Sequence, residues 1–221
     1  QIIHDVALQN LHVIFMIDRA GIVGSDGETH HGIYDLSYLS HIPNLIIMAP
    51  KSATELEKML EFAVNYNGPV AIRYPKDGYI NNLKGETNEI KICRAEIMQE
   101  GTDVTLIGFG KTVSTAVKIS EIKKDKSFEI INLRFLKPLD KETILKSIRK
   151  TKNVVVIEDN IITGGLCSAI KDLIANEKEI RLVYKKDTTK CVCDEIDKTT
   201  LNEMSDIVRG MTRKTDAQLR M

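Results

Sequence analysis

The chain has 221 residues, of which 43% are hydrophobic and 28% are charged, and these fractions are typical of a soluble globular protein. Its 31 basic side chains balance 31 acidic ones, so no net charge attracts nucleic acid or an anionic membrane. No apolar run approaches the roughly 20 residues of a membrane-spanning helix. We therefore expect neither nucleic acid nor a membrane among its partners.

The start of the chain and its cysteines bound the protein further. The first residue is Gln1, and neither a basic leader nor an apolar signal segment follows it, so we expect the natural protein to be longer. The four cysteines are too few and too scattered for a disulfide framework, and the close pair lacks a second pair of zinc ligands. They are Cys93, Cys167, Cys191 and Cys193. We expect reduced thiols and a cytoplasmic location.

Short apolar runs alternate with segments of helical period, which predicts an α/β fold of mainly parallel sheets flanked by helices. The predicted strands are 13–17, 45–48, 70–74, 104–109, 129–133, 154–158 and 180–184. The clearest helix lies between the second and third strands, where Ser52 and Glu55 indicate a capping box. Its apolar face is predicted to contain Leu56, Met59, Leu60 and Ala63. Further helices are predicted around 113–117, 144–148 and 166–173.

A polar segment divides the chain. Residues 79–91 offer almost nothing to bury and follow the turn signal Asp77-Gly78, so they are predicted to be a linker. The predicted parts are an incomplete first domain, 1–78, and a second domain, 92–221. The tail after Lys185 is polar and weakly patterned, and nothing in it predicts a role.

The segment 18–32, DRAGIVGSDGETHHG, follows the first predicted strand and contains four glycines, which leave little side chain to fill a core. Ligands bind at the carboxyl ends of strands in open α/β sheets. Arg19 stands there and can hold a phosphate or a carboxylate with two parallel hydrogen bonds. Asp26 and His30 are four residues apart and could face one small polar ligand, with His30 as proton donor or oxyanion partner.

A purely structural interpretation of this loop is equally open. In it, Arg19 pairs with Asp18 or Asp26 to pin the loop, and His30 and His31 only decorate it. A second cationic cluster, which contains Arg73 and Lys76, lies at the end of the third predicted strand, and in a parallel sheet it shares an edge with Arg19. Together these cations would suit a phosphorylated substrate, although a solvated basic turn explains the second cluster equally well.

Two glycine pairs have no strong functional signal. Gly108 and Gly110 begin a dinucleotide fingerprint, but Val113 occupies the place of the third glycine, so they predict a tight turn between strand and helix. Gly164 and Gly165 precede the last predicted helix and predict the same kind of turn, with an anion contact at the helix amino terminus as the alternative.

The longest motifs identify a family. The segments DRAGIVGSDGETHHG and NGPVAIRYPKDG, with GTDVTLIGFGKTV, NLRFLKPLD and VVVIEDNIITGG after them, resemble the 1-deoxy-D-xylulose-5-phosphate synthases of the transketolase superfamily. The resemblance covers Gln1 to about Lys185, and the tail with Cys191 and Cys193 is left without an assignment. It implies a partial pyrimidine-binding domain joined to a transketolase carboxyl-terminal domain.

The resemblance also implies a reaction. This family uses thiamine diphosphate and Mg²⁺ to condense pyruvate with glyceraldehyde 3-phosphate, with release of carbon dioxide, as part of isoprenoid, thiamine and pyridoxal biosynthesis, and its members are homodimers. By the same resemblance Arg19 and Lys76 hold the acceptor phosphate, and Asp26 and His30 lie at the reacting oxygens. Lys76 replaces the usual Arg and loses the bidentate fork, so Arg73 is predicted to share its role.

The parts that the resemblance places upstream of Gln1 limit the expected activity. In the family they carry a Glu and an aromatic segment for the aminopyrimidine ring and a domain for diphosphate and magnesium. We therefore expect no cofactor-binding or metal-binding residue in this chain and no turnover by it alone. Two alternatives remain at this point: a non-catalytic assembly module of the same fold, and the beta subunit of a 2-oxoacid dehydrogenase.

Overall fold

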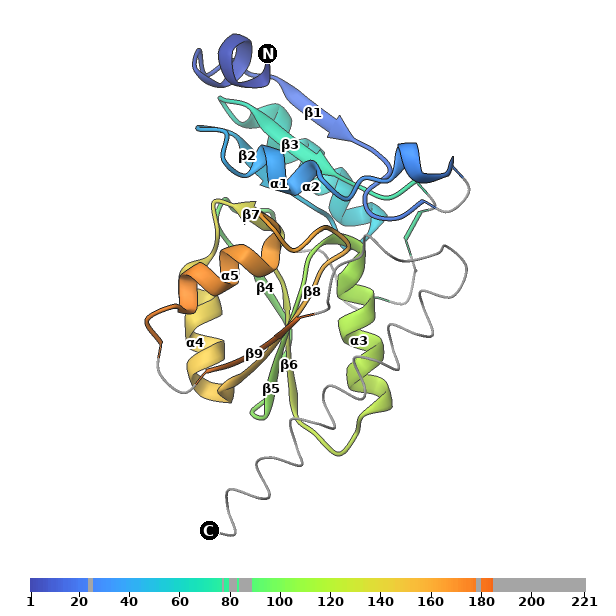
Figure 1. Cartoon of the computed structure of the whole chain (residues 1–221), viewed down its shortest axis with the longest axis vertical. Coiled ribbons are helices and arrows are strands. Elements are labelled where there is room, and N and C mark those ends of the chain that lie inside the picture. Colours follow the sequence, from blue (N-terminus) through green and yellow to red (C-terminus); the bar gives the residue numbers. More distant parts are fainter. Residues whose placement is uncertain (24–25, 77, 80–82, 84–88, 178–179, 185–221) are drawn as a thin grey trace.

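Two β-sheets form the framework of the molecule, one above the other in Figure 1. The computed structural model describes residues 1–23, 26–76, 78–79, 83, 89–177 and 180–184. The first sheet has the strand order β1-β3-β2-β7, and the second has the order β4-β6-β5-β8-β9. The strands are β1 (Ile14–Ile17), β2 (Ile46–Met48), β3 (Val70–Arg73), β4 (Glu96–Gln99), β5 (Val104–Gly108), β6 (Phe128–Asn132), β7 (Phe135–Lys137), β8 (Asn153–Ile157) and β9 (Arg181–Tyr184).

Helices cover both sheets. In Figure 1, α3 lies on one side of the second sheet, and α4 and α5 lie on the other. The helices are α1 (Asp35–Leu39), α2 (Ala53–Asn65), α3 (Val113–Ile122), α4 (Lys141–Thr151) and α5 (Leu166–Ile174), with short helical turns η1 (Ile2–Ala7), η3 (Glu28–His30) and η4 (Gly110–Thr112). Sheets with helices on two faces and mainly parallel strands confirm the predicted fold class.

The central strands are mostly apolar because both of their faces are buried, and Thr105, Glu129 and Asn132 are buried polar exceptions. Successive side chains of a strand point to opposite faces. Leu106 of β5 packs in the cluster that contains Ala116 of α3, whereas its neighbour Ile107 packs in the cluster that contains Ile148 of α4. A strand buried on both faces reads as a continuous apolar run rather than an alternating one. This explains why the sequence predicts β5, β6 and β8 so clearly.

The first sheet brings the predicted functional loops to one edge. β1 and β3 are parallel neighbours with Ile17 opposite Arg73, and beyond the strands the Ala20 N–H donates to the Tyr74 carbonyl over 3.0 Å. The segment after β1 and the segment after β3 therefore leave the sheet side by side, as predicted. β7 follows β6 of the second sheet in the chain but pairs antiparallel with β2. The second half of the chain therefore adds one strand to the first sheet.

Each of the seven predicted strands corresponds to an observed one within about two residues. β4, β7, α1, η1 and η3 have no counterpart among the elements predicted from the sequence. β4 and β7 are four and three residues long and flanked by polar or turn residues, so neither gives a periodic signal. The domain boundaries 1–78, 79–91 and 92–221 remain a prediction. Part of the proposed linker, the tail after Tyr184, Cys191 and Cys193 lie outside the described residues.

The helix α2 begins as predicted but differs on its apolar face. The Ser52 hydroxyl accepts a hydrogen bond from the Glu55 N–H (3.2 Å), which caps the helix. Met59 and Ala63 are fully buried, whereas Leu60, predicted on the same face, is 39% exposed. The Glu55 carboxylate is fully buried and accepts from the Lys51 N–H over 2.6 Å.

Glu55 also belongs to a buried polar group that joins the two sheets, which we call the junction cluster: Lys51, Glu55, Glu96, Asn132 and Arg134. The Arg134 Nε donates to Glu55 over 2.7 Å, and its Nη2 lies 3.3 Å from the Glu96 carboxylate. Lys51 Nζ donates to Glu96 over 2.5 Å. Burial raises the pKa of Glu96, but the hydrogen bonds from Lys51 and Asn132 outweigh it, so the pKa is lower than usual. Because α2 packs on the first sheet and Glu96 lies in a strand of the second, the cluster fixes one sheet against the other.

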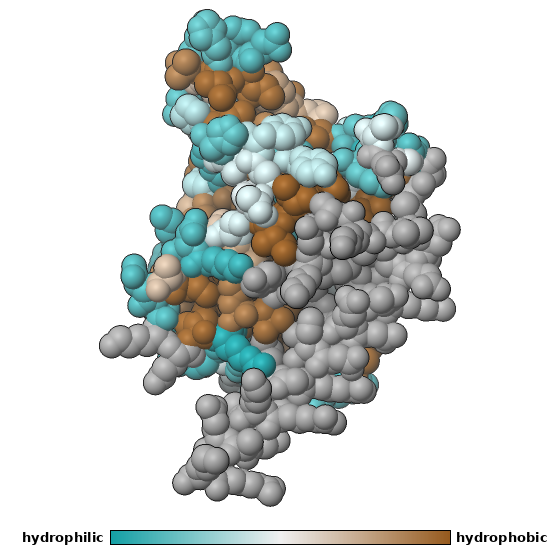
Figure 2. Space-filling model, viewed as in Figure 1, coloured by the Kyte–Doolittle hydropathy of each residue, from teal (hydrophilic) through white to brown (hydrophobic). Residues whose placement is uncertain are grey.

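Several apolar side chains remain exposed near the start of the chain, where Figure 2 shows apolar surface beside polar residues. They are Ile3, Leu8, Leu11 and Met16, which are 41 to 63% exposed. β1 lies at the outer edge of the first sheet.

None of the described helices is long and apolar enough to span a membrane.

Candidate active-site loop and its supporting network

The loop that follows β1 is closed at its neck by backbone hydrogen bonds between two glycines. The Gly21 N–H donates to the Gly32 carbonyl and the Gly32 N–H to the Gly21 carbonyl, both over 2.9 Å. Gly32 N–H also lies 3.1 Å from the Arg19 carbonyl, and a Cβ at Gly32 would stand 2.3 Å from that oxygen. Only glycine permits such an approach. Arg19 itself adopts a left-handed backbone, with φ of 59°.

Three predicted site residues meet in one ion cluster. Arg19 Nε donates to the Asp26 carboxylate over 2.9 Å, and Lys76 Nζ pairs with the other oxygen of that carboxylate. Hydrogen bonds from Lys76 and then from Arg19 lower the pKa of Asp26 to about 2, so it is ionised at neutral pH. Arg19 also pairs with Asp18. Arg19 and Lys76 therefore share the Asp26 carboxylate.

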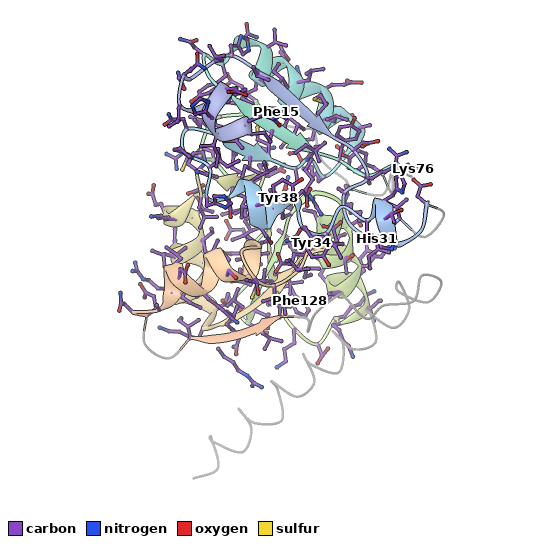
Figure 3. All side chains as sticks on the ribbon, turned by 45° about the horizontal axis from the view of Figure 1, so that its top comes forward. Phe15, His31, Tyr34, Tyr38, Lys76 and Phe128 are labelled. Atoms are coloured by element: carbon purple, nitrogen blue, oxygen red, sulfur yellow. The ribbon has the colours of Figure 1, made fainter. Side chains whose placement is uncertain are left out.

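The two histidines of the loop differ in their surroundings. His30 ends η3, is exposed, and has its Nδ1 2.9 Å from the Thr29 hydroxyl. His31 Nδ1 accepts a hydrogen bond from the Val23 N–H over 2.9 Å, which fixes the loop internally. Figure 3 places His31 and Lys76 at the same corner of the molecule, beside η3. His31 is thus hydrogen-bonded within the loop, whereas His30 is exposed.

Arg73, the third predicted phosphate ligand, is buried instead of presented at the edge, with 2% of its side chain exposed. All three of its guanidinium nitrogens donate to the protein. Nε bonds Asp35 (2.6 Å), Nη1 bonds the Asp159 carboxylate (2.7 Å), and Nη2 bonds the Gly32 carbonyl (2.7 Å) and, over 3.3 Å, the Asp159 carbonyl. In this structure the guanidinium joins the loop neck to two carboxylates.

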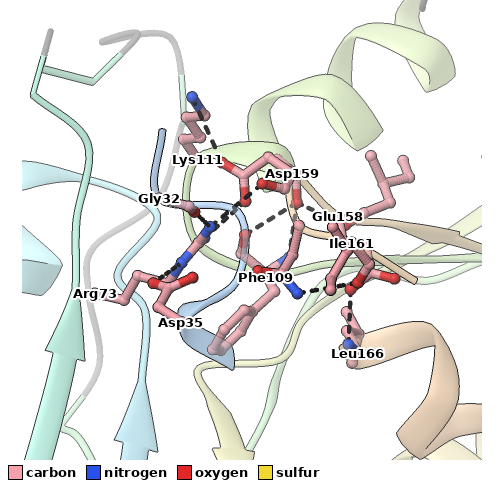
Figure 4. A network of polar contacts seen from close by, with 12 residues as sticks. Gly32, Asp35, Arg73, Phe109, Lys111, Glu158, Asp159, Ile161 and Leu166 are labelled. Carbon is pink, nitrogen blue, oxygen red and sulfur yellow. Dashed lines mark hydrogen bonds and ion pairs between the residues drawn. The ribbon is translucent and has the colours of Figure 1, made fainter. Parts of the chain in front are cut away.

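Asp159 carries this network across to the second sheet, because it follows β8 (Figure 4). Its carboxylate also lies 3.5 Å from Lys111 Nζ in η4. Burial raises the pKa of Asp159, but the charges of Arg73 and Lys111 outweigh it and leave the pKa lower than usual. Burial raises the pKa of Asp35, and Arg73 only partly offsets that rise.

Glu158, the neighbour of Asp159, occupies the amino terminus of α5. Its carboxylate accepts from the Leu166 N–H (2.7 Å) and the Cys167 N–H (3.1 Å). Burial raises its pKa to about 7 in spite of these two bonds. The anion contact considered for Gly164 and Gly165 is therefore made by a carboxylate of the chain itself.

The sequence analysis did not single out Asp35, Lys111 or Asp159. A signal for Asp159 was present, since Glu158 and Asp159 follow an apolar strand just as Arg19 and Arg73 do. Their partners could not be inferred, because Arg73 and Asp159 are 86 residues apart in the chain.

Comparison with known proteins agrees with this architecture. The model of the transketolase pyrimidine binding domain matches residues 1–81, and that of the transketolase C-terminal domain matches residues 94–200. Among solved structures, a chain described as "Split gene transketolase, inactive beta4 tetramer" has a TM-score of 0.76 at 24% identity and covers 91% of this chain and 64% of its own. A Pichia stipitis transketolase mutant has a TM-score of 0.59 at 18% identity, over 69% of this chain and 24% of its own. The two domain models and the shared fold place the chain in the transketolase family.

Curated relatives narrow the assignment. The 1-deoxy-D-xylulose-5-phosphate synthase of Pelotomaculum thermopropionicum is 49% identical over 179 residues, and synthase 1 of Geobacter sulfurreducens is 47% identical over 180 residues. Each match covers 80% of this chain and 28% of the relative. By sequence, the chain corresponds to the carboxyl-terminal portion of 1-deoxy-D-xylulose-5-phosphate synthase, and it spans little more than a quarter of the length of these relatives.

Proposed function

We propose that residues 1–221 are the acceptor-binding and carboxyl-terminal part of a thiamine-diphosphate-dependent synthase. This enzyme would condense pyruvate with glyceraldehyde 3-phosphate, release carbon dioxide and form 1-deoxy-D-xylulose 5-phosphate. The identity to synthases of that name supports this activity. It does not favour an assembly module or a 2-oxoacid dehydrogenase subunit.

The observation that carries the proposal is that Arg19 and Lys76, which follow two different strands, both reach one carboxylate. Two cations that can hold a single carboxylate are also placed to hold a single phosphate, and a phosphate dianion has more charge and more acceptor oxygens. Arg19 would supply the two-pronged contact and Lys76 a point charge. Arg73, whose nitrogens are engaged, would support the loop rather than touch the phosphate.

Asp26 and His30 would act on the oxygens of the reacting carbons. Asp26 is ionised at neutral pH, so it can accept a hydrogen bond from a substrate hydroxyl. His30 is exposed on η3, and its imidazole can donate to a carbonyl oxygen that gains negative charge. Both side chains belong to the loop whose neck Gly21 and Gly32 close, so one backbone unit would present them to the substrate.

The cofactor would be held mainly by another part of the protein. Thiamine diphosphate supplies the carbanion chemistry when it is bound, and its diphosphate needs a metal ion. Among the described residues, no group of three or more His, Cys, Asp and Glu side chains could hold such an ion. In the proposal, an amino-terminal portion of the same enzyme supplies the site for that ion, and the whole enzyme is a homodimer.

Titration calorimetry tests the proposed division of labour. We expect residues 1–221 alone to show no magnesium-dependent binding of thiamine diphosphate, because the proposal assigns the diphosphate and its metal ion to the amino-terminal portion of the enzyme. The complete polypeptide, titrated under the same conditions, is the positive control. Tight, magnesium-dependent binding by residues 1–221 would contradict the proposal.

Replacing Arg19 with Met in the complete enzyme tests the phosphate site. We expect the KM for glyceraldehyde 3-phosphate to rise by about 100-fold while the KM for pyruvate changes by less than about twofold, because only the acceptor carries a phosphate. Arg149→Met, which removes an exposed arginine paired with Glu177, is the matched control and should leave both constants unchanged. Equal rises in both KM values for Arg19→Met would refute the phosphate role.

A further inference from the structure

The second sheet contacts the neck of the candidate active-site loop through Asp159. This residue follows β8, and its side chain reaches Arg73 at the end of β3, with Nη1 and Oδ1 2.7 Å apart (Figure 4). Its backbone carbonyl accepts a second, longer bond of 3.3 Å from Arg73 Nη2. Side chain and backbone of one residue therefore hold the same guanidinium. A contact of this kind fixes direction as well as distance.

Asp159 also packs directly on the beginning of the loop. Gly21 has a left-handed backbone, with φ of 80°, and a Cβ built there would stand 2.4 Å from Asp159 Oδ2 and 3.0 Å from Lys111 Nζ. Only a glycine leaves room for the carboxylate at this distance. Lys111 lies on the same side of the carboxylate as Gly21, with its Nζ 3.5 Å from Oδ2. An ion pair of the second half of the chain therefore packs against the backbone of the loop at Gly21.

Through Arg73 the same carboxylate reaches the end of the loop. Arg73 Nη2 donates to the Gly32 carbonyl over 2.7 Å, and the Gly32 N–H in turn donates to the Arg19 carbonyl over 3.1 Å. Asp159 touches the neck at Gly21, and its partner touches the neck at Gly32. The backbone of Arg19 is therefore connected to the second sheet by two short chains of contacts.

We propose that Asp159 is a positioning residue for Arg19: through Gly21 and the Arg73 bridge, the second sheet sets the orientation in which the loop meets the phosphate of the acceptor. This inference rests on the proposed function, because it takes Arg19 as a ligand of the acceptor phosphate. The alternative is that Asp159 only joins the two sheets. A purely structural role would not act through Arg19, so the two can be told apart.

The test uses Asp159→Asn in the complete enzyme, since Asn keeps an oxygen that can accept from Arg73 but loses the charge. We expect the KM for glyceraldehyde 3-phosphate to rise by about tenfold. The KM for pyruvate and that for unphosphorylated glyceraldehyde should stay within about twofold of the original values. Asp103→Asn is the matched control, because Asp103 is an aspartate of the second sheet that accepts from the Ser127 N–H (2.9 Å). It should change none of the three constants.

Coupling to Arg19 separates positioning from structural support. If Asp159 acts through Arg19, the double variant Arg19→Met, Asp159→Asn should be no worse toward the phosphorylated acceptor than Arg19→Met alone. If the effects of the two substitutions on the KM for the phosphorylated acceptor multiply, the inference is overturned. An unchanged KM in Asp159→Asn would overturn it as well. An unchanged KM in Arg19→Met would overturn the phosphate site, and the inference with it. A raised KM in Arg19→Met beside an unchanged one in Asp159→Asn would overturn the positioning role alone.

Asp159→Glu keeps the test decisive if Asp159→Asn fails to fold. The longer side chain retains the charge that Arg73 and Lys111 need, but it moves the carboxylate by one methylene toward or past Gly21. We expect the same selective rise in the KM for the phosphorylated acceptor. A folded Asp159→Glu enzyme with wild-type constants for all three substrates would refute the inference.

Discussion

Replacing Arg134 with Met is expected to lower the free energy of unfolding by about 3–5 kcal/mol, because it leaves the fully buried Glu55 carboxylate without the guanidinium that pairs with it. Arg134 is 4% exposed, and its guanidinium lies between Glu55, which is fully buried, and Glu96. Lys51 would remain beside Glu96, but it cannot also compensate Glu55 with its one charge. Urea unfolding of the variant, followed by circular dichroism, measures the loss.

The junction cluster also predicts where that loss appears. Because Glu55 belongs to α2 and Glu96 to β4, we expect amide hydrogen exchange to accelerate on both sides of the junction. Arg149→Met removes an exposed partner of Glu177 and is the control, for which we expect no measurable change in stability. If Arg134→Met unfolded at the same urea concentration as the control, the junction cluster would not support the fold.

The second large effect is expected at Arg73. Arg73→Met should also cost about 3–5 kcal/mol at neutral pH, since it leaves Asp35 and Asp159 in the interior without the guanidinium that both share. The loop neck loses its bond at the Gly32 carbonyl as well. Arg94→Met, which removes an exposed arginine near Glu142, serves as the control and should have little effect.

The loss of unfolding free energy in Arg73→Met should depend on pH, and the burial of the two carboxylates determines the direction of that dependence. Without Arg73, burial raises the pKa of Asp35 and of Asp159 in the folded state above the values in the unfolded chain. The folded variant then binds more protons than the unfolded one, so its stability falls as pH rises through that range. The difference from the original protein should therefore shrink from pH 7 to pH 5. A difference that grows on acidification would show that the two carboxylates are not the cause.

The candidate active-site loop shows how much residue patterns can predict. Arg19, Arg73 and Lys76 were assigned to one edge because each lies at or just after the carboxyl end of an apolar strand, and the parallel pairing of β1 with β3 confirms that edge. The chemical environment of each cation was not predictable. Arg19 and Lys76 face one partly exposed carboxylate, whereas Arg73 points into the interior. Position along a strand fixes the edge, but the neighbouring elements decide whether a side chain meets solvent.

The same limit applies to Glu55. Its spacing from Ser52 predicts a capping box, and Ser52 does cap α2. The Glu55 carboxylate accepts from the nearby Lys51 N–H, but it also accepts from Asn132 and Arg134, which lie 77 and 79 residues further along the chain. Local spacing identifies partners within one turn of a helix, whereas a buried charge takes whichever opposite charge the packing of the sheets brings to it.

Residue patterns alone predict seven of the described strands, the main helices, the edge where the loops gather and the family. These follow from short-range order, because apolar runs, caps and glycines restrict the backbone near them. Only the tertiary structure decided that β7 leaves its own sheet, that Asp159 touches Gly21, and that Arg73 bridges the two sheets. Pairings of this kind join residues far apart in the chain. They depend on how two sheets pack and on which buried charges must be compensated, and local sequence patterns predict neither.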